Sequence, residues 1–283
     1  MDRLAFSTNA FKKNTLDEAI RAIAFAGYRG VELMADVPHA YPPQLSAERR
    51  RELLKFITSL RLTVSNINAF THFADGDTYH PTWIEADLEQ RDARVRHTLA
   101  CIELAADMQC GTVSLQPGGP LLGTGLSAGA AAERFADGLS HVLPAARERG
   151  VVLAVEPEPG LLIQTSGEFI EFKQSFFADE PSVRMNCDVG HLFCVGEEPH
   201  EVIRAHPGEI AHVHLEDIGA NHVHQHLAPG RGVIDFKAIF AALEAIDYRG
   251  WVTVELYPYE ATAAEVARTA RAHLAQFISP RRL

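Results

Sequence analysis

The sequence alternates between short runs rich in β-branched and other apolar residues and longer stretches with helical periodicity. The alternation occurs eight times at an average spacing of about 35 residues, which suits one βα unit per repeat. Eight βα units in series are the number that closes a parallel barrel. The predicted strands are Leu4–Thr8, Val31–Met34, Thr63–Asn68, Thr112–Gln116, Val151–Glu156, Val183–Asp188, Ile210–Leu215 and Trp251–Leu256.

Helix start and stop signals lie between the predicted strands. Thr15-Leu16-Asp17-Glu18 is a capping box that opens a helix ending near Gly27, and Ser46 caps a second helix that runs through Leu60. Glycine turns such as Arg149-Gly150 end helices just before the next strand. The further predicted helices are Trp83–Met108, Ala128–Arg149, Gly167–Phe177, His200–His206, Phe236–Ile246 and Ala261–Phe277.

These elements predict an α/β fold, a single (β/α)8 TIM barrel that takes in residues 1–283 as one domain. A doubly wound sheet is the alternative, but it normally has fewer strands and a glycine-rich phosphate turn after its first strand. Here the first strand runs into Ser7-Thr8-Asn9-Ala10 without a GxGxxG motif. No Pro-, Gly- or Ser-rich linker divides the chain either, so the barrel is favoured.

Charge and cysteine usage narrow the class of partner. Lys and Arg total 26 against 37 Asp and Glu, and a formal net charge of −11 repels nucleic acid. The four cysteines form no CxxC pair, so neither a thiol redox motif nor a zinc ribbon is expected. No apolar run approaches the roughly 20 residues that span a bilayer, and the N-terminus has no signal-peptide pattern. We expect a cytoplasmic protein that binds no membrane.

Two predicted connections are long, residues 68–83 after the third strand and residues 216–235 after the seventh. Both leave the carboxyl ends of their strands, which is the end where a barrel of this kind builds its active site. Long loops without secondary structure inside a compact domain are usually functional. We therefore expect both loops to cover a substrate.

The fifth to eighth predicted strands each end with a carboxylate or an imidazole. These residues are Glu156, Asp188, His214 and Glu255. Because the carboxyl ends of parallel strands meet at one rim, we expect the four side chains to lie together. Three carboxylates and one imidazole suit Mn²⁺, Mg²⁺, Co²⁺ or Zn²⁺, and the absence of thiolate argues against a structural zinc site. A metal centre is favoured over a polar network without metal.

The strand-end motifs resemble those of the xylose-isomerase-like TIM-barrel superfamily. They are most similar to its sugar isomerase and epimerase branch, which includes ketose 3-epimerases and inosose-processing enzymes. The resemblance covers essentially the whole chain. The motifs that carry it are Val155-Glu156-Pro157, Cys187-Asp188-Val189-Gly190-His191, His212-Val213-His214-Leu215 and Val254-Glu255.

The resemblance implies roles for individual residues. It implies that one divalent metal ion, Mn²⁺ in the first place, is bound by the four strand-end residues. Glu156 and Glu255 would also act as the acid/base pair, and His191 and Arg231 would hold substrate oxygen atoms. Association into a homo-oligomer is a habit of the family and rests on nothing else in the sequence.

One departure from the ketose 3-epimerase pattern concerns the substrate. Those enzymes place a further substrate-binding Glu several residues after the fifth strand, where this chain has Leu161-Leu162-Ile163. Glu158 lies only two residues beyond Glu156 and is the candidate here. The further candidates for substrate contact, taken from loops and strand ends, are His72, Gln116 and His226.

The predicted function is that of a metal-dependent isomerase or epimerase acting on a keto-sugar or related polyol. A proton next to the carbonyl would move between two glutamates through an enediolate. The alternatives are a lyase or dehydratase that uses the same metal site, an endonuclease-like metal phosphoesterase, and a non-catalytic sugar-binding protein. The expected partner is thus a small sugar or polyol.

Overall fold

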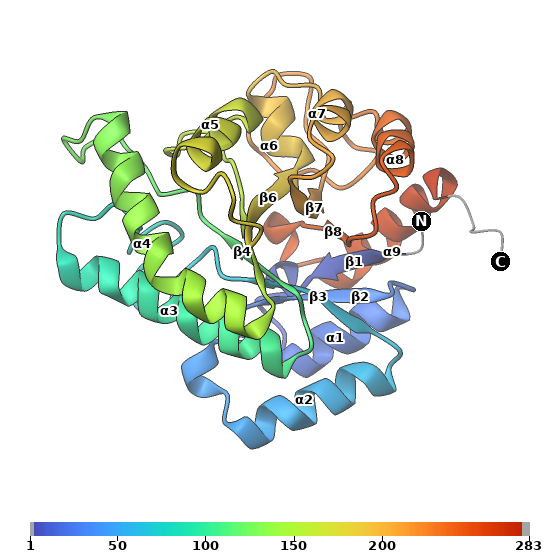
Figure 1. The fold of residues 1–283 in the computed structure, drawn as a ribbon. Helices are drawn as coiled ribbons and strands as arrows, with labels where there is room; N and C mark the ends of the chain where they lie inside the picture. The colour runs from blue at the N-terminus through green and yellow to red at the C-terminus, as the bar shows by residue number, and fades with distance from the viewer. Residues whose placement is uncertain (1–2, 279–283) are drawn as a thin grey trace.

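The computed structural model describes residues 3–278 and confirms the predicted α/β barrel (Figure 1). Parallel strands pair in sequence order, and β8 pairs with β1, with Ala5 opposite Thr253, so the sheet closes on itself. Helices surround the barrel (Figure 1). The strands are β1 (Leu4–Ser7), β2 (Gly30–Met34), β3 (Thr63–Asn68), β4 (Thr112–Leu115), β5 (Val152–Val155), β6 (Val183–Asp188), β7 (Ile210–Leu215) and β8 (Val252–Val254).

The first two helices begin where the sequence places their caps. Thr15 and Glu18 form the predicted capping box, and the Ser46 hydroxyl accepts the N–H of Arg49 at 3.1 Å. None of the helices within residues 3–278 combines the length and apolar character needed to cross a bilayer. The helices are α1 (Leu16–Phe25), α2 (Ala47–Ser59), α3 (Leu88–Asp107), α4 (Ala128–Arg149), α5 (Ser166–Phe176), α6 (Val189–Cys194), α7 (Pro199–Ala205), α8 (Phe236–Ala245) and α9 (Ala263–Leu274).

The helix predicted to start at Trp83 starts five residues later. Asp87 caps α3 by accepting the N–H of Glu89 at 2.8 Å. The preceding residues stay in a loop because Glu85 accepts a local backbone hydrogen bond from Thr82. Trp83 is fully buried in this loop, where its ring lies 5.6 Å from that of Phe135.

The short helix α6 follows β6 without an intervening loop and was not predicted. The Asp188 carboxylate caps it by accepting the N–H of His191 at 2.8 Å. Gly190 is required at the start of this helix because a Cβ there would collide with the Glu216 carboxylate. The cap holds Asp188 and His191 at the rim of the barrel.

The two faces of the closed sheet differ in character. Strand residues that point outward are apolar and pack under the helices, as Val31, Leu33 and Val213 do. A bulge between Val31 and Glu32 sets Glu32 opposite Asn66. The buried polar side chains of the strands include Glu32, Ser65, Asn66, Ser114, Asn186, His212 and Thr253.

Buried charged side chains hold the two long loops. The fully buried Arg94 guanidinium donates to the carbonyls of Pro81 and Phe70 at 2.7 and 2.9 Å, and the Asp36 carboxylate accepts the Ala74 N–H at 3.1 Å. The loop after β7 is held by Asp217, which also forms an isolated antiparallel bridge with Leu227. Both loops are therefore ordered at the carboxyl end of the barrel.

Candidate metal centre and active site

Glu156, Asp188, His214 and Glu255 converge at the carboxyl end of the barrel, where they end or directly follow β5 to β8. One ligand atom from each lies within 4.8 Å of the ligand atoms of the others. Nδ1 of His214 lies at the centre of the group, 3.0 Å from Glu156 Oε1 and 3.7 Å from Glu255 Oε1. It lies 3.9 Å from Oδ2 of Asp188. All four side chains are buried.

The charges of this group call for a cation. Burial raises the pKa of Glu255, and the carboxylate of Glu156 raises it further. Burial opposes the charged form of His214, but Glu32 and Glu156 outweigh it and raise the pKa of this imidazole well above its usual value. Oδ2 of Asp188 is buried without a hydrogen-bond partner. A donor set of three carboxylates and one imidazole, with one oxygen unsatisfied, fits a divalent cation.

Glu32 supports this site, and the sequence did not predict it. Its Oε2 lies 2.7 Å from Nε2 of His214, on the side of the ring that faces away from the other three carboxylates. Asn66 and Asn68 donate to the two oxygens of Glu32 at 3.0 and 3.1 Å. A carboxylate on the second nitrogen of a ligating histidine fixes the tautomer and orientation of the ring. In the sequence, the sign of this role was a charged residue that lies between two apolar residues within a predicted strand.

Two amides hold Glu255 in place. Asn9 and Asn68 both donate to Oε1 of Glu255, at 2.8 and 3.1 Å. Asn9 lies in the short 3-10 helix Thr8–Phe11 that follows β1, and Asn68 ends β3, so the first half of the barrel orients a glutamate of the second half. Sequence reasoning missed both asparagines because a strand-end amide carries no charge and no ligand pattern.

A cavity of about 350 Å³ lies above the group, and three residues of the predicted substrate shell line it, namely Glu158, His191 and His226. His191 and His226 donate from Nδ1 to the carbonyls of Pro157 and Glu255, both at 3.1 Å. Burial lowers the pKa of His191 to about 3 and that of His226 to about 4, so both rings are neutral at pH 7. Burial also raises the pKa of Glu158.

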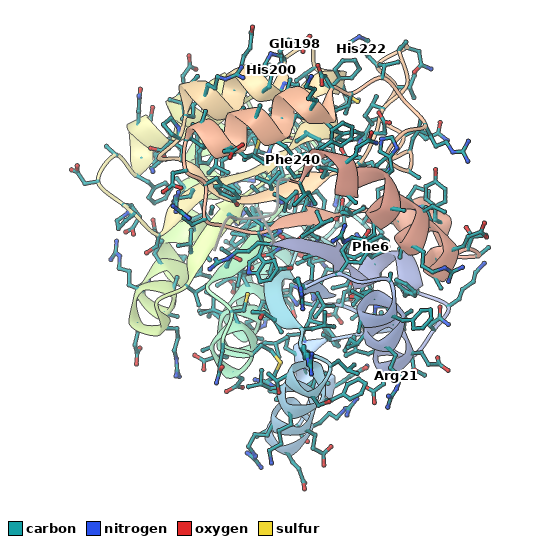
Figure 2. All side chains as sticks on the ribbon, turned by 90° about the vertical axis from the view of Figure 1, so that its right-hand side faces the viewer. Phe6, Arg21, Glu198, His200, His222 and Phe240 are labelled. Atoms are coloured by element: carbon teal, nitrogen blue, oxygen red, sulfur yellow. The ribbon has the colours of Figure 1, made fainter. Side chains whose placement is uncertain are left out.

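The three histidines of the loop after β7 have different environments. His224 lines the cavity with His226, and their Nε2 atoms lie 3.2 Å apart. His222 instead lies on the outside of the molecule, stacked on Phe193 with ring centroids 4.2 Å apart (Figure 2). The sequence had favoured only His226, and the alternate spacing of the three residues does not show which of them turn inward.

Three residues expected at the substrate do not line the cavity. His72 packs against the His97 ring at 4.3 Å because the Arg94 and Asp36 anchors turn the loop after β3. Gln116 is fully buried and donates to the Tyr79 carbonyl at 2.9 Å. Arg231 is exposed. Its turn faces outward because the Asp217 carboxylate binds the N–H groups of the flanking glycines at 2.9 and 2.8 Å.

Several cavity residues were absent from the prediction. Lys12 lies at the wall, 2.8 Å from Glu260 and over the Phe73 ring. Tyr79 and Tyr257 contribute hydroxyl groups. Their signal in the sequence was only their position in loops at the carboxyl end of the barrel.

Comparison with known proteins agrees with the fold. The family model described as xylose isomerase-like TIM barrel matches residues 20–277. The chain is 27% identical over 282 residues to the inosose dehydratase of Clostridium beijerinckii, covering 93% of this chain and 90% of that protein. It is 34% identical over 156 residues to the inosose dehydratase of Geobacillus thermodenitrificans, about half of each chain, 49% and 52%.

Solved structures show the same barrel. The crystal structure of IolI protein with a binding zinc atom superposes with a TM-score of 0.79 at 18% identity and covers 98% of this chain and 100% of that one. The structure of 3-keto-D-glucoside 4-epimerase, YcjR, from E. coli gives a TM-score of 0.79 at 20% identity with the same coverage. Because the sequence identities are this low, the likeness to these structures shows a shared fold and no more. The match of the family model over most of the chain shows that this protein belongs to the xylose isomerase-like TIM-barrel family.

Proposed function

We propose that the protein is a divalent-metal-dependent isomerase or epimerase that moves a proton next to the carbonyl of a keto-sugar or related polyol. The observation that carries the proposal is the pair of glutamates at the cavity, Glu156 and Glu255, which converge with Asp188 and His214 on one point. Two proton carriers beside a cation site are what removal and return of a carbon-bound proton requires.

In this proposal Glu156, Asp188, His214 and Glu255 hold the metal ion. A bound divalent ion, Mn²⁺ in the first place with Mg²⁺, Co²⁺ or Zn²⁺ as alternatives, polarises the substrate carbonyl and a neighbouring hydroxyl group. The zinc atom in the IolI structure supports a divalent ion in a barrel of this kind. Glu32 keeps the Nδ1 atom of His214 turned toward the other ligands.

The two glutamates divide the proton transfer. One takes the proton from the carbon next to the carbonyl, which leaves an enediolate, and the other returns a proton to it. The hydrogen bonds from Asn9 and Asn68 occupy Oε1 of Glu255, so they fix the carboxylate while its Oε2 is free to accept a proton. Glu158, His191 and His226 hold substrate oxygen atoms in the cavity.

Turnover in D₂O tests the proposal. With the Mn²⁺-loaded protein and an inosose or a ketose such as D-tagatose, we expect deuterium at the carbon next to the carbonyl in the product and in recovered substrate. Glu156→Gln should abolish the exchange, whereas Glu133→Gln, on the exposed face of α4, should not alter it. Product that forms without deuterium, while glutamate protons exchange rapidly, would contradict proton transfer between two glutamates.

A second candidate is a dehydratase that uses the same first step. The curated relatives favour it, because two relatives whose alignments cover 93% of this chain are named inosose dehydratase. After removal of the proton, the enediolate electrons would expel a β-hydroxyl group, which takes a proton from a glutamate and leaves as water. Dehydration of an inosose yields an ultraviolet-absorbing enolised diketone, whereas epimerisation keeps the mass and the absorbance unchanged. Mass spectrometry of the product therefore separates the two reactions.

The cytoplasmic location and the association into a homo-oligomer stay predictions. Size-exclusion chromatography with light scattering would measure the oligomeric state directly.

A further inference from the structure

The cavity contains a second pair of polar side chains apart from the proposed metal ligands. The hydroxyl group of Tyr79 donates to Oε1 of Glu158 at 3.0 Å. Both residues line the cavity, and Glu158 is only 5% exposed. Tyr79 comes from the loop after β3 and Glu158 from the segment after β5, so the pair joins two loops across the mouth of the barrel.

Two buried side chains hold the backbone of Tyr79 in place. Its carbonyl accepts hydrogen bonds from Nε2 of Gln116 at 2.9 Å and from Nη2 of Arg94 at 3.4 Å. Both donors are fully buried. The phenol is therefore held over the cavity before any ligand arrives, which lowers the entropy cost of binding.

The backbone of Glu158 is equally constrained. Its N–H donates to the carbonyl of Ile163 at 3.0 Å, and its carbonyl accepts the N–H of Leu161 at 3.1 Å. These bonds close a tight turn around Gly160, whose φ of 87° lies in the left-handed region. The turn thus fixes the backbone position from which the carboxylate reaches the phenol.

The chemistry of the pair selects a particular ligand group. Tyr79 uses its proton on Oε1, which leaves the lone pairs of the phenol oxygen and Oε2 of Glu158 for a ligand. An alcohol can donate to the carboxylate while accepting from the phenol as the bonds rearrange. A carbonyl oxygen can only accept, so it would leave the carboxylate without a donor.

The charges around the cavity disfavour an anionic substrate. Three carboxylates line it, those of Glu156, Glu158 and Glu255. Lys12 is the only lysine or arginine among the lining residues of the described chain, and it is paired with Glu260 at 2.8 Å. A phosphate group would therefore meet a lysine whose charge the Glu260 carboxylate already balances.

We propose that Tyr79 and Glu158 form a hydroxyl-binding dyad that holds an alcohol group of an uncharged polyol substrate, at a carbon other than the one that loses its proton. The inference rests on the proposed function for the reacting carbon, but recognition by the dyad does not depend on the reaction itself. Tyr79 is here a specificity residue, and Gln116 positions it.

The first experiment compares Tyr79→Phe with Tyr41→Phe in the full-length protein loaded with Mn²⁺. Tyr41 is a matched control because its hydroxyl group also donates to a carboxylate. The acceptor is Asp75, at 3.1 Å, in the loop after β3 that carries Tyr79, and Tyr41 does not line the cavity. Binding of an inosose, myo-inositol and D-fructose is measured by calorimetry. Removal of one member of a buried hydrogen-bonded pair leaves its partner unsatisfied, so we expect Tyr79→Phe to lose about tenfold or more in affinity. The change for Tyr41→Phe should stay within about twofold.

Glu158→Gln completes the test of the dyad. We expect a similar loss of affinity, and the double variant should lose little more than either single variant because the two residues act as a unit. Equal effects of Tyr79→Phe and Tyr41→Phe would overturn the proposal, as would additive losses in the double variant. Absence of binding for all three uncharged polyols would overturn it too.

A further comparison tests the charge of the substrate. D-fructose 6-phosphate should bind at least about tenfold more weakly than D-fructose, because the carboxylates repel it. Tighter binding of the phosphate ester would overturn the assignment to an uncharged polyol. If the polyols bind through the dyad but no deuterium enters from D₂O, the proposed reaction fails while the dyad stands.

Discussion

The two halves of the barrel contribute different chemistry to one rim. Strands β5 to β8 supply the carboxylates and the imidazole that converge on a single point. Strands β1 to β4 supply amides and one buried carboxylate, and these groups bind side chains of the other half: Asn9 and Asn68 hold Glu255, and Glu32 holds His214. In the proposed reaction, the second half of the barrel would carry out the proton transfer and the first half would orient the groups that do so.

The choice of amides in the first half has an electrostatic reason. The rim already holds several carboxylates, whose like charges raise the pKa of Glu255 beyond the effect of burial. A further carboxylate at Asn9 or Asn68 would add repulsion, whereas an amide N–H donates to the charge already present. The first half therefore stabilises negative charge without competing for the proposed cation.

The largest effect is expected in the second half, from Asp188→Asn. The substitution keeps the shape of the side chain but removes the charge of a proposed ligand, so metal affinity should fall by more than about 100-fold. The rise in melting temperature on adding Mn²⁺ should disappear with it, because that rise follows from binding to the native state. Asp179→Asn, at an exposed position, is the control. An unchanged response of Asp188→Asn would remove this residue from the metal site.

A smaller loss is expected in the first half, from Glu32→Gln. The amide cannot accept the His214 proton as a charged partner, so metal affinity should fall about 10- to 100-fold, as it does when such partners of ligating histidines are replaced. Competition with a chelator measures the affinity, and Glu32→Asp should recover part of it. Wild-type affinity in Glu32→Gln would break the division between the two halves.

A buried histidine outside the site, His97, predicts how the stability of the barrel depends on pH. Burial lowers the pKa of His97 well below its usual value, so the folded state keeps this ring neutral while the unfolded chain takes up a proton near pH 6.5. The unfolded state then binds more protons, and stability falls as the pH drops below about 6.5. His97→Phe should reduce the loss between pH 7.5 and 5.5 by roughly 1 kcal/mol in urea unfolding. An unchanged loss would show that the ring is already charged in the folded protein.

The smallest effect is expected for Arg231→Ala. The family resemblance implies a place at the substrate for this arginine, but the structure leaves it exposed outside the cavity lining. The KM for an inosose or ketose should therefore change less than about twofold. An increase of tenfold or more would show that the loop after β7 moves to bring Arg231 to the substrate.

The sequence predicted the second half of the rim better than the first. Glu156, Asp188, His214 and Glu255 end or directly follow strands, and the closure of the barrel is enough to bring such residues together. Glu32 lies within β2, and its meeting with His214 depends on the bulge after Val31, which no local pattern announces.

The loops were the least predictable part. The direction of the loop after β3 is decided by Arg94, which lies on a helix further along the chain and binds carbonyls rather than side chains. Backbone carbonyls are present at every residue, so the sequence cannot show which of them an arginine will bind. His72 was expected at the substrate for this reason, and Tyr79 was overlooked.

The loop after β7 contains no helix or strand, but the Asp217 side chain holds its two ends together. Its two carboxylate oxygens accept the N–H groups of Ile218, Gly230, Gly232 and Ile234 at 2.8 to 3.0 Å. These amides should exchange with solvent slowly and together, because one side chain must leave before any of them opens. The residues between the two anchored ends, 219–229, can then be replaced as a cassette. Loops that carry other side chains in place of His224 and His226 would change the lining of the cavity while the anchor stays intact.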